Sequence, residues 1–173
     1  VMTSKRTHDE ARMQRQAVRA SLQIAKQCFA FLESEFGYVM QSSRSDSAGW
    51  ELRYVGMNEI GVRIVDERRE DLILILISRL DAGMMVENES PISGTSCIRC
   101  INFNDALAPA QRIRPGYFYG NHSPYHDPKL GNERYIRDAS ICLRTYGRDL
   151  LDGAPEKFDV AAAALRARAA TSQ

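Results

Sequence analysis

The stretch "WELRYVGMNEIGVRIVDERREDLILILISRL" (50–80) decides the fold, because its apolar residues first alternate and then become continuous. Trp50, Leu52 and Tyr54 alternate with charged residues, which predicts a strand with one buried face. The segment at 60–66 repeats this alternation, and 72–80 is apolar on both faces, as a central strand is. Turn-forming residues separate the segments, so we expect consecutive antiparallel strands.

The residues before this stretch predict one more strand and a long helix. "YVMQ" (38–41) begins the first of four strands in an antiparallel meander. Upstream, apolar residues recur at spacings of three and four, which predicts an amphipathic helix that ends at Gly37. They are Val18, Leu22, Ala25, Phe29, Leu32 and Phe36. A capping box at 7–10 predicts the helix start, and we expect residues 1–8 to be frayed. Residues 9–16 lack apolar partners, so the first two turns of the helix should project into solvent.

The second half of the chain predicts an irregular insert followed by helices. Residues 84–130 show no sustained period and hold most of the six prolines, apart from one short helix at "NDALA" (104–108). Beyond them, two apolar stripes separated by Gly153 and Pro155 predict two C-terminal helices. We therefore expect a single α+β domain over 1–173: a long N-terminal helix, a four-stranded antiparallel meander sheet, an irregular insert and two C-terminal helices.

Bulk composition narrows the functional classes. Of the 173 residues, 44% are hydrophobic and 26% are charged, which is typical of globular domains. The net charge of +1 predicts no overall positive electrostatic field that would attract nucleic acid. It leaves open whether charged residues gather in local patches. No apolar run approaches the ~18 residues of a membrane span. Four cysteines are too few for a disulfide scaffold, so we expect a cytoplasmic protein that does not associate with membranes.

A metal site is the first candidate for chemistry. Cys97 and Cys100 form a C-x2-C pair, and His122 and His126 form an H-x3-H pair after a gap of 21 residues, so a zinc site is one interpretation. Pro124 lies between the histidines and disfavours the regular helix that would align them, and the gap exceeds the finger spacing of about 12. We expect no metal and no cofactor, with both cysteines semi-buried on a short strand or turn and the histidines as polar surface groups; a zinc-stabilised module is the alternative.

Nucleophilic and redox chemistry are further alternatives. A small hydrolase would pair Ser93, Ser96 or Cys97 with His122 or His126, oriented by Asp127. No glycine-rich phosphate loop and no nucleophile elbow is present, and no βαβ pattern surrounds the cysteine pair. The acidic and basic residues of "DERRED" (66–71) predict a solvated hairpin turn. We expect that the protein is not an enzyme.

The insert carries the strongest candidate for a binding surface. Aromatic and guanidinium groups gather there without helical or strand spacing, and these groups dominate protein–protein hot spots. The expected partner-binding residues are Arg112, Arg114, Tyr117, Phe118, Tyr119 and Tyr125. Stacking on single-stranded nucleic acid and ordinary cover of the core are the other interpretations.

Three phrases carry a resemblance to a known group of proteins. They are "FAFLESEFGY" (29–38), the stretch at 50–83 and "LRTYGRDLLDG" (143–153). Together they resemble small uncharacterised bacterial proteins, some of which are similar to the immunity proteins of polymorphic toxin systems. The shared residues, among them Phe36, Gly37 and Leu80, are packing and turn residues. The resemblance implies a non-catalytic cytoplasmic inhibitor that binds a toxin domain, with specificity in a variable region such as 84–130.

A further functional class is a homo-oligomeric structural protein that associates through its first helix. Its apolar stripe keeps a 3.5-residue repeat, which coiled-coil pairing would use. The sheet also needs a cover, and we expect Leu22, Phe29 and Leu32 to pack on it within the same chain. The sequence leaves the oligomeric state open and does not identify the partner.

Overall fold

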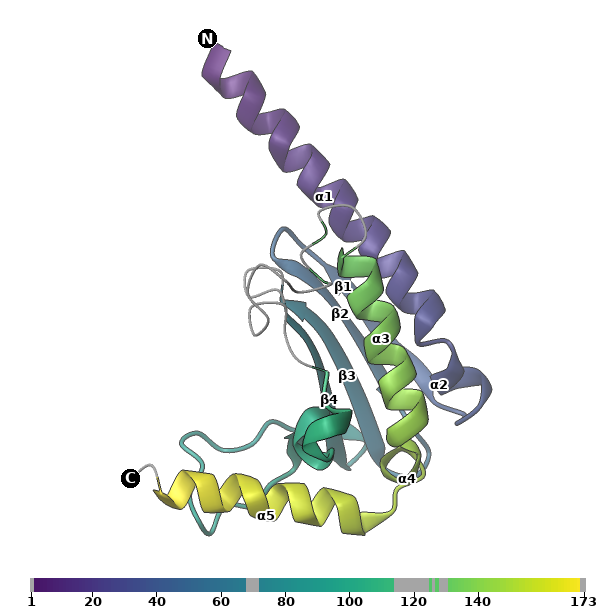
Figure 1. The fold of residues 1–173 in the computed structure, drawn as a ribbon, viewed down its shortest axis with the longest axis vertical. Coiled ribbons are helices and arrows are strands. Elements are labelled where there is room, and N and C mark those ends of the chain that lie inside the picture. The colour runs from purple at the N-terminus through teal and green to yellow at the C-terminus, as the bar shows by residue number, and fades with distance from the viewer. Residues whose placement is uncertain (1, 68–71, 114–124, 126, 128–130, 172–173) are drawn as a thin grey trace.

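The structure is a computed structural model that describes residues 2–67, 72–113, 125, 127 and 131–171. It is an α+β fold in which one curved antiparallel sheet carries helices on one face (Figure 1). The larger elements are α1 (Met2–Cys28), α2 (Phe31–Ser34), β1 (Val39–Ser45), β2 (Gly49–Val55), β3 (Ile60–Glu67), β4 (Leu72–Asp81), α3 (Gly131–Tyr146), α4 (Arg148–Leu151) and α5 (Pro155–Thr171). The fold class therefore agrees with the sequence-based prediction.

The meander predicted from the alternating segments is confirmed, with two short strands added. Strands β1 to β4 are neighbours in chain order and pair antiparallel. The segment expected to be irregular adds β5 (Met84–Met85) and β6 (Cys100–Asn102), both paired with β4. It also holds two short 3-10 helices, Phe103–Ala106 and Pro109–Gln111. Strands of two and three residues are too short to show a period, so the sequence could not indicate them.

Helix α1 has different ends from those predicted. It is helical from Met2, ahead of the capping box at 7–10, and no glycine or proline interrupts 2–28. It ends at Cys28, and a turn leads into α2, so Gly37, at φ +70°, follows the second helix rather than one continuous helix. Residues 11–17 are all exposed, and the helix extends past the end of the sheet, as the missing apolar partners predicted (Figure 1).

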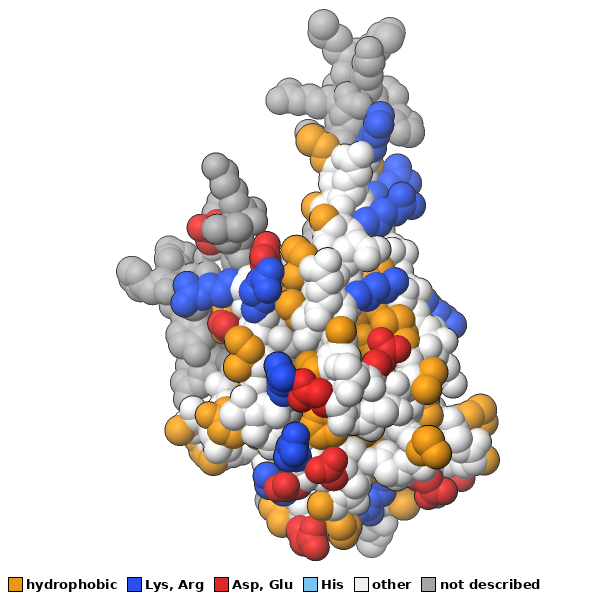
Figure 2. Space-filling view, turned by 90° about the vertical axis from the view of Figure 1, so that its right-hand side faces the viewer, with side chains coloured by type: hydrophobic (Ala, Val, Ile, Leu, Met, Phe, Trp, Pro, Cys, Tyr) orange, Lys and Arg blue, Asp and Glu red, His pale blue; other side chains and the backbone are white. Residues whose placement is uncertain are grey.

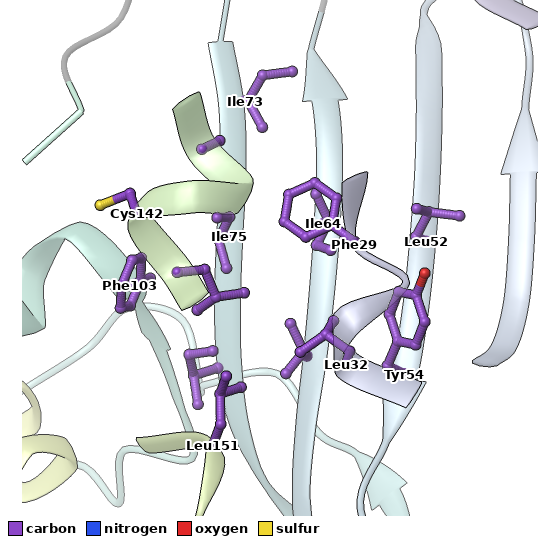
Figure 3. Packing of buried hydrophobic residues seen from close by; sticks show 14 of the residues in the cluster. Phe29, Leu32, Leu52, Tyr54, Ile64, Ile73, Ile75, Phe103, Cys142 and Leu151 are labelled. Carbon is purple, nitrogen blue, oxygen red and sulfur yellow. The ribbon is translucent and has the colours of Figure 1, made fainter. Parts of the chain in front are cut away.

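The core lies between the sheet and the helices. Leu22, Phe29 and Leu32 are 7%, 0% and 0% exposed, which confirms that the apolar stripe packs within its own chain. Phe29 and Leu32 face side chains of β2 and β3 (Figure 3). A polar link joins the layers, because Trp50 Nε1 donates to Ser21 Oγ at 2.8 Å and Ser21 donates to Asn132 at 2.6 Å. Full burial of these side chains makes the stripe a main source of stability.

The C-terminal helices are interrupted where a side chain cannot fit. α3 ends at Tyr146, and a Cβ on Gly147 would lie 2.5 Å from the carbonyl oxygen of Leu143, so this turn requires glycine. The single turn α4 follows, and Gly153 at φ +85° and Pro155 then separate it from α5, as predicted. Within the described ranges, no helix combines the length and apolarity that crossing a membrane requires.

Candidate functional site

The sheet has one covered face and one open face. Strand alternation turns Trp50, Leu52 and Tyr54 of β2 toward the helices, where each is at most 2% exposed. The intervening residues point the other way, and the register aligns them with residues of β3 and β4. Glu51, Arg53, Val55, Arg63, Val65, Leu74 and Leu76 lie on this side and all retain partial exposure. We call this side the open face.

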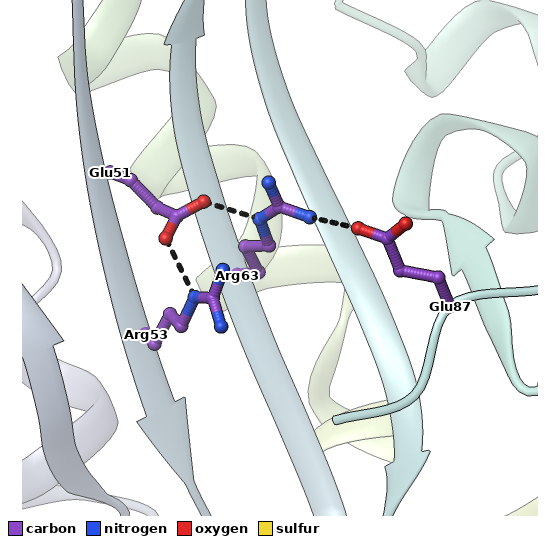
Figure 4. A network of polar contacts seen from close by, with 4 residues as sticks. All are labelled: Glu51, Arg53, Arg63 and Glu87. Carbon is purple, nitrogen blue, oxygen red and sulfur yellow. Dashed lines mark hydrogen bonds and ion pairs between the residues drawn. The ribbon is translucent and has the colours of Figure 1, made fainter. Parts of the chain in front are cut away.

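A charged cluster occupies the centre of the open face. Arg53 and Arg63 are directly opposite each other in the β2–β3 register, an arrangement that is normally repulsive. Glu51 resolves it, because Arg53 Nε donates to Glu51 Oε1 at 2.6 Å and Arg63 Nε donates to Glu51 Oε2 at 2.5 Å. Arg63 Nη1 also donates to Glu87 at 3.1 Å (Figure 4). One carboxylate thus holds two guanidinium groups side by side.

Glu51 is the buried centre of this cluster. Its side chain is 15% exposed, whereas that of Glu87 is 85% exposed, so the two carboxylates contribute very differently. Burial opposes the ionisation of Glu51, but hydrogen bonds and charge from Arg53 and Arg63 outweigh it and lower its pKa below the ordinary 4.5. The carboxylate therefore stays charged at neutral pH and fixes the orientation of both arginines.

The cluster borders a broad open depression of about 790 Å³. Its walls include Arg44 of β1, the three clustered residues Glu51, Arg53 and Arg63, and Val65 of β3. Arg44 is exposed and makes no ion pair within the described chain. The depression is thus lined by three arginines from three adjacent strands and also by four acidic residues, Asp46, Glu51, Asp66 and Glu67.

The guanidinium groups of the cluster keep unused donors. Each arginine side chain carries five N–H donors. Within the described chain, Arg53 donates only from Nε, and Arg63 donates only from Nε and Nη1. Planar forks of this kind bind carboxylates in a bidentate manner. An anionic group can therefore be bound at the arginine donors, beside the apolar side chain of Val65, whereas Asp46, Asp66 and Glu67 add negative charge to the lining of the same depression.

The residues of the zinc interpretation are only partly described. Cys97 is exposed in a loop, which differs from the semi-buried position expected, and Cys100 is half-buried in β6. His122 and His126 lie outside the described residues. In the described part of the chain, no group of three or more His, Cys, Asp or Glu residues could hold a metal ion.

Of the nucleophile candidates, Ser93 and Ser96 are hydrogen-bonded to each other, and Cys97 is exposed; the other two thiols named below are more buried. Burial raises the pKa of the Cys100 and Cys142 thiols, that of Cys142 to about 11, which disfavours their nucleophilic thiolate forms at neutral pH. Ser96 is 3% exposed, and its Oγ accepts from the backbone N–H of Ser93 at 2.7 Å, which closes a turn. Asp127 is exposed.

The insert residues predicted to bind a partner divide into two groups. Arg114, Tyr117, Phe118 and Tyr119 lie outside the described residues. Arg112 is exposed, and its Nε donates to the carbonyl oxygen of Leu107 at 3.1 Å.

Tyr125 is tied to the body of the protein. Its ring stacks on Tyr135 with centroids 4.4 Å apart, and its hydroxyl donates to Asp138 at 2.9 Å. It packs against the core and remains partly exposed, so its position suits the core-cover interpretation.

In the charged hairpin, Asp66 is 3% exposed, and residues 68–71 lie outside the described residues.

Sequence reasoning did not identify the arginine cluster as a site. The alternation of 50–54 placed Glu51 and Arg53 on the outer side of β2, which the structure confirms. The position of Arg63 opposite Arg53 depends on the hairpin register, and an alternating pattern does not specify that register to the residue. The signal in the sequence was the pair Glu51 and Arg53 on one predicted strand, followed by Arg63 as the one outward-facing arginine of the next strand.

The chain matches no family model, and no curated protein or solved structure matches it at a significant level. The functional argument therefore rests on the geometry of the open face.

Proposed function

We propose that the chain is a non-catalytic binding protein that holds a protein partner against the open face of its sheet. The observation that carries the proposal is the pair Arg53 and Arg63, fixed side by side by the half-buried Glu51. Like charges directly opposite on neighbouring strands cost stability. Such a local conflict is expected where the arrangement serves binding.

The chemistry of the face suggests what the partner presents. Unused donors on Arg53 and Arg63, together with exposed Arg44, favour one or more carboxylates at the centre of the contact. The partly exposed Val65, Leu74 and Leu76 add apolar area beside them, as the core of an interface requires. Arginine is also enriched among residues that dominate binding energy. The expected partner is therefore a protein with an acidic patch that has an apolar border.

The resemblance described above suggests a class of partner. An immunity-type role would make the partner a toxin domain, and the open face would cover its acidic surface. The insert residues Arg114, Tyr117, Phe118 and Tyr119 stay a predicted additional contact under this proposal.

Arg44 allows a clean test. It forms no ion pair within the described chain, so Arg44→Ala should leave folding unchanged and remove one donor group from the depression. Arg134 on α3 is equally exposed and equally unpaired there, and Arg134→Ala is the matched control. Proteins captured by the wild-type chain would be purified, and their dissociation constants would be measured by calorimetry with each variant.

We expect Arg44→Ala to weaken the specific partner about tenfold or more, and Arg134→Ala to leave its affinity unchanged. Arg63→Lys provides a second probe, because lysine keeps the charge beside Glu51 and loses the planar fork. Full affinity in both Arg44→Ala and Arg63→Lys would remove the open face from the functional account.

A further inference from the structure

A second charged feature lies on α1, away from the open face. Between Ala11 and Cys28 the helix contains four basic residues and no acidic residue, although the whole chain has a net charge of only +1. They are Arg12, Arg15, Arg19 and Lys26. Their spacings of three, four and seven residues place them along one side of the helix. We call this line of residues the basic stripe.

The basic stripe is free to meet a ligand. Arg12, Arg15 and Arg19 are exposed and Lys26 is half-buried, and none of the four forms an ion pair within the described chain. Arginines elsewhere, such as Arg137 and Arg168, are held by nearby carboxylates. Figure 2 shows blue Lys and Arg side chains along the described part of the projecting helix, with no red acidic side chain among them. The stripe therefore produces a local positive field that the net charge conceals.

The geometry of α1 restricts what the ligand can be. Gln14 donates to the carbonyl oxygen of Ser47 at 3.3 Å, and the helix continues beyond this contact to Met2, past the end of the sheet (Figure 1). At a rise of ~1.5 Å per residue, Arg12 and Lys26 lie about 21 Å apart along the axis. The exposed segment 11–17 has the ~10–12 Å diameter of a free helix and fits the major groove of a nucleic-acid duplex, which is about 12 Å wide, whereas from Val18 onward α1 packs on the body of the protein.

Other ligands fit this surface less well. Residues 11–17 contain only Ala11, Met13 and Ala17 as apolar residues, and these do not form a stripe. A helix that lies in a membrane surface requires an apolar face opposite its charges. A stable protein interface likewise requires an apolar centre. A row of phosphates requires neither, because its affinity comes from neutralised charge.

We propose that the basic stripe binds the phosphate backbone of a duplex nucleic acid without sequence preference. Arg12, Arg15, Arg19 and Lys26 each neutralise one phosphate, the first two in the exposed segment 11–17 of α1 and the last two in the segment that packs on the sheet through Leu22 and Ala25. The basic stripe and the open face lie on different elements, α1 and the sheet. The stripe would allow one molecule to hold a protein partner and a nucleic acid together.

The test measures binding of a fluorescently labelled, random-sequence DNA duplex by anisotropy over a range of salt concentrations. Each neutralised phosphate contributes about −0.9 to the slope of log affinity against log salt, so four contacts predict a slope of about −3.6. Between ~50 and ~200 mM salt the affinity should then fall about a hundredfold. Arg15→Gln/Arg19→Gln should halve the slope to about −1.8, and glutamine should keep the helix intact, as circular dichroism would verify.

A matched control removes the same charge elsewhere. Arg134→Gln/Arg166→Gln eliminates two arginines of α3 and α5 that are also unpaired within the described chain, and it should retain the wild-type slope. No duplex binding at ~50 mM salt, or equal losses in both double variants, would overturn the proposal. Tighter binding to vesicles of anionic phospholipid than to the duplex would also overturn it, and would assign the stripe to a membrane surface.

Discussion

Replacing Glu51 with glutamine tests how the arginine pair is held. Glu51 accepts from Arg53 Nε at 2.6 Å and from Arg63 Nε at 2.5 Å, and its side chain is 15% exposed. Glutamine preserves the volume and one carbonyl acceptor, but it replaces the other acceptor with an amide that faces a guanidinium. Arg53 and Arg63 would then lie opposite each other without a buried counterion.

The magnitude follows from these contacts. A hydrogen bond to a charged group contributes about 1.5–3 kcal/mol, and one of the two is lost. Like charges directly opposite on neighbouring strands add roughly 0.2–1 kcal/mol. The partial exposure of both arginines screens part of the effect. We expect Glu51→Gln to lower the free energy of unfolding by about 2 kcal/mol and the melting temperature by about 4–8 °C.

Glu87 provides the matched control, because it pairs with the same Arg63 but is 85% exposed. Glu87→Gln should change stability by less than about 0.5 kcal/mol. Urea denaturation of the wild type and both variants compares the free energies directly. Equal effects of Glu51→Gln and Glu87→Gln would refute the reasoning that burial makes Glu51 the centre of the cluster.

The pH dependence follows from the lowered pKa of Glu51. A carboxyl group with a lower pKa in the folded state stabilises the protein above its unfolded pKa, and this contribution is lost as the pH falls through the folded pKa. The stability difference between the wild type and Glu51→Gln should therefore be largest near neutral pH and shrink below the ordinary value of 4.5. A difference that stays constant down to acid unfolding would contradict the assigned ionisation.

Three further predictions concern the core and the thiols. The Tyr54 hydroxyl is buried and has no hydrogen-bond partner in the described structure, so Tyr54→Phe should leave stability unchanged or raise it by about 1 kcal/mol. Tyr38→Phe should instead cost about 0.5–1.5 kcal/mol, because the Tyr38 hydroxyl donates to the carbonyl oxygen of Leu151; the reverse order in thermal unfolding would contradict both assignments. Leu32→Ala should cost ~2–5 kcal/mol because Leu32 is 0% exposed, and an unchanged unfolding midpoint would show that the stripe is assigned wrongly. Exposed Cys97 should react with a thiol reagent well before Cys142, which is 6% exposed and has a pKa raised to about 11; mass spectrometry that finds Cys142 labelled first would argue against this packing.

The elements that were predicted from sequence are long enough for their apolar residues to show a helix or strand periodicity. The meander followed from the alternation in 50–66, and the covering helix followed from a stripe that includes Leu22 and Leu32. The strands Met84–Met85 and Cys100–Asn102 were missed because they are too short for a period. The second is supported by a side chain, since Asn88 Oδ1 accepts from the backbone N–H of Cys100 at 2.9 Å.

The candidate site was less accessible to sequence reasoning, because it depends on pairing between strands. Alternation indicates that Glu51 and Arg53 point outward, but only the register shows that Arg63 lies opposite Arg53. The aromatic cluster of the insert drew attention because it is local in sequence. Tyr125, its one described aromatic residue, stacks on Tyr135 and contributes to packing.

The most direct test of the account compares two surfaces against the same purified partner. Arg44→Ala/Arg63→Lys alters the open face, and Tyr117→Ala/Tyr119→Ala alters the insert. Calorimetry should show that the open-face variant loses affinity by about thirtyfold or more, and Arg44→Ala alone should lose affinity with an unchanged melting temperature. Wild-type affinity in the open-face variant, together with a large loss in the insert variant, would contradict the claim that the sheet holds the partner.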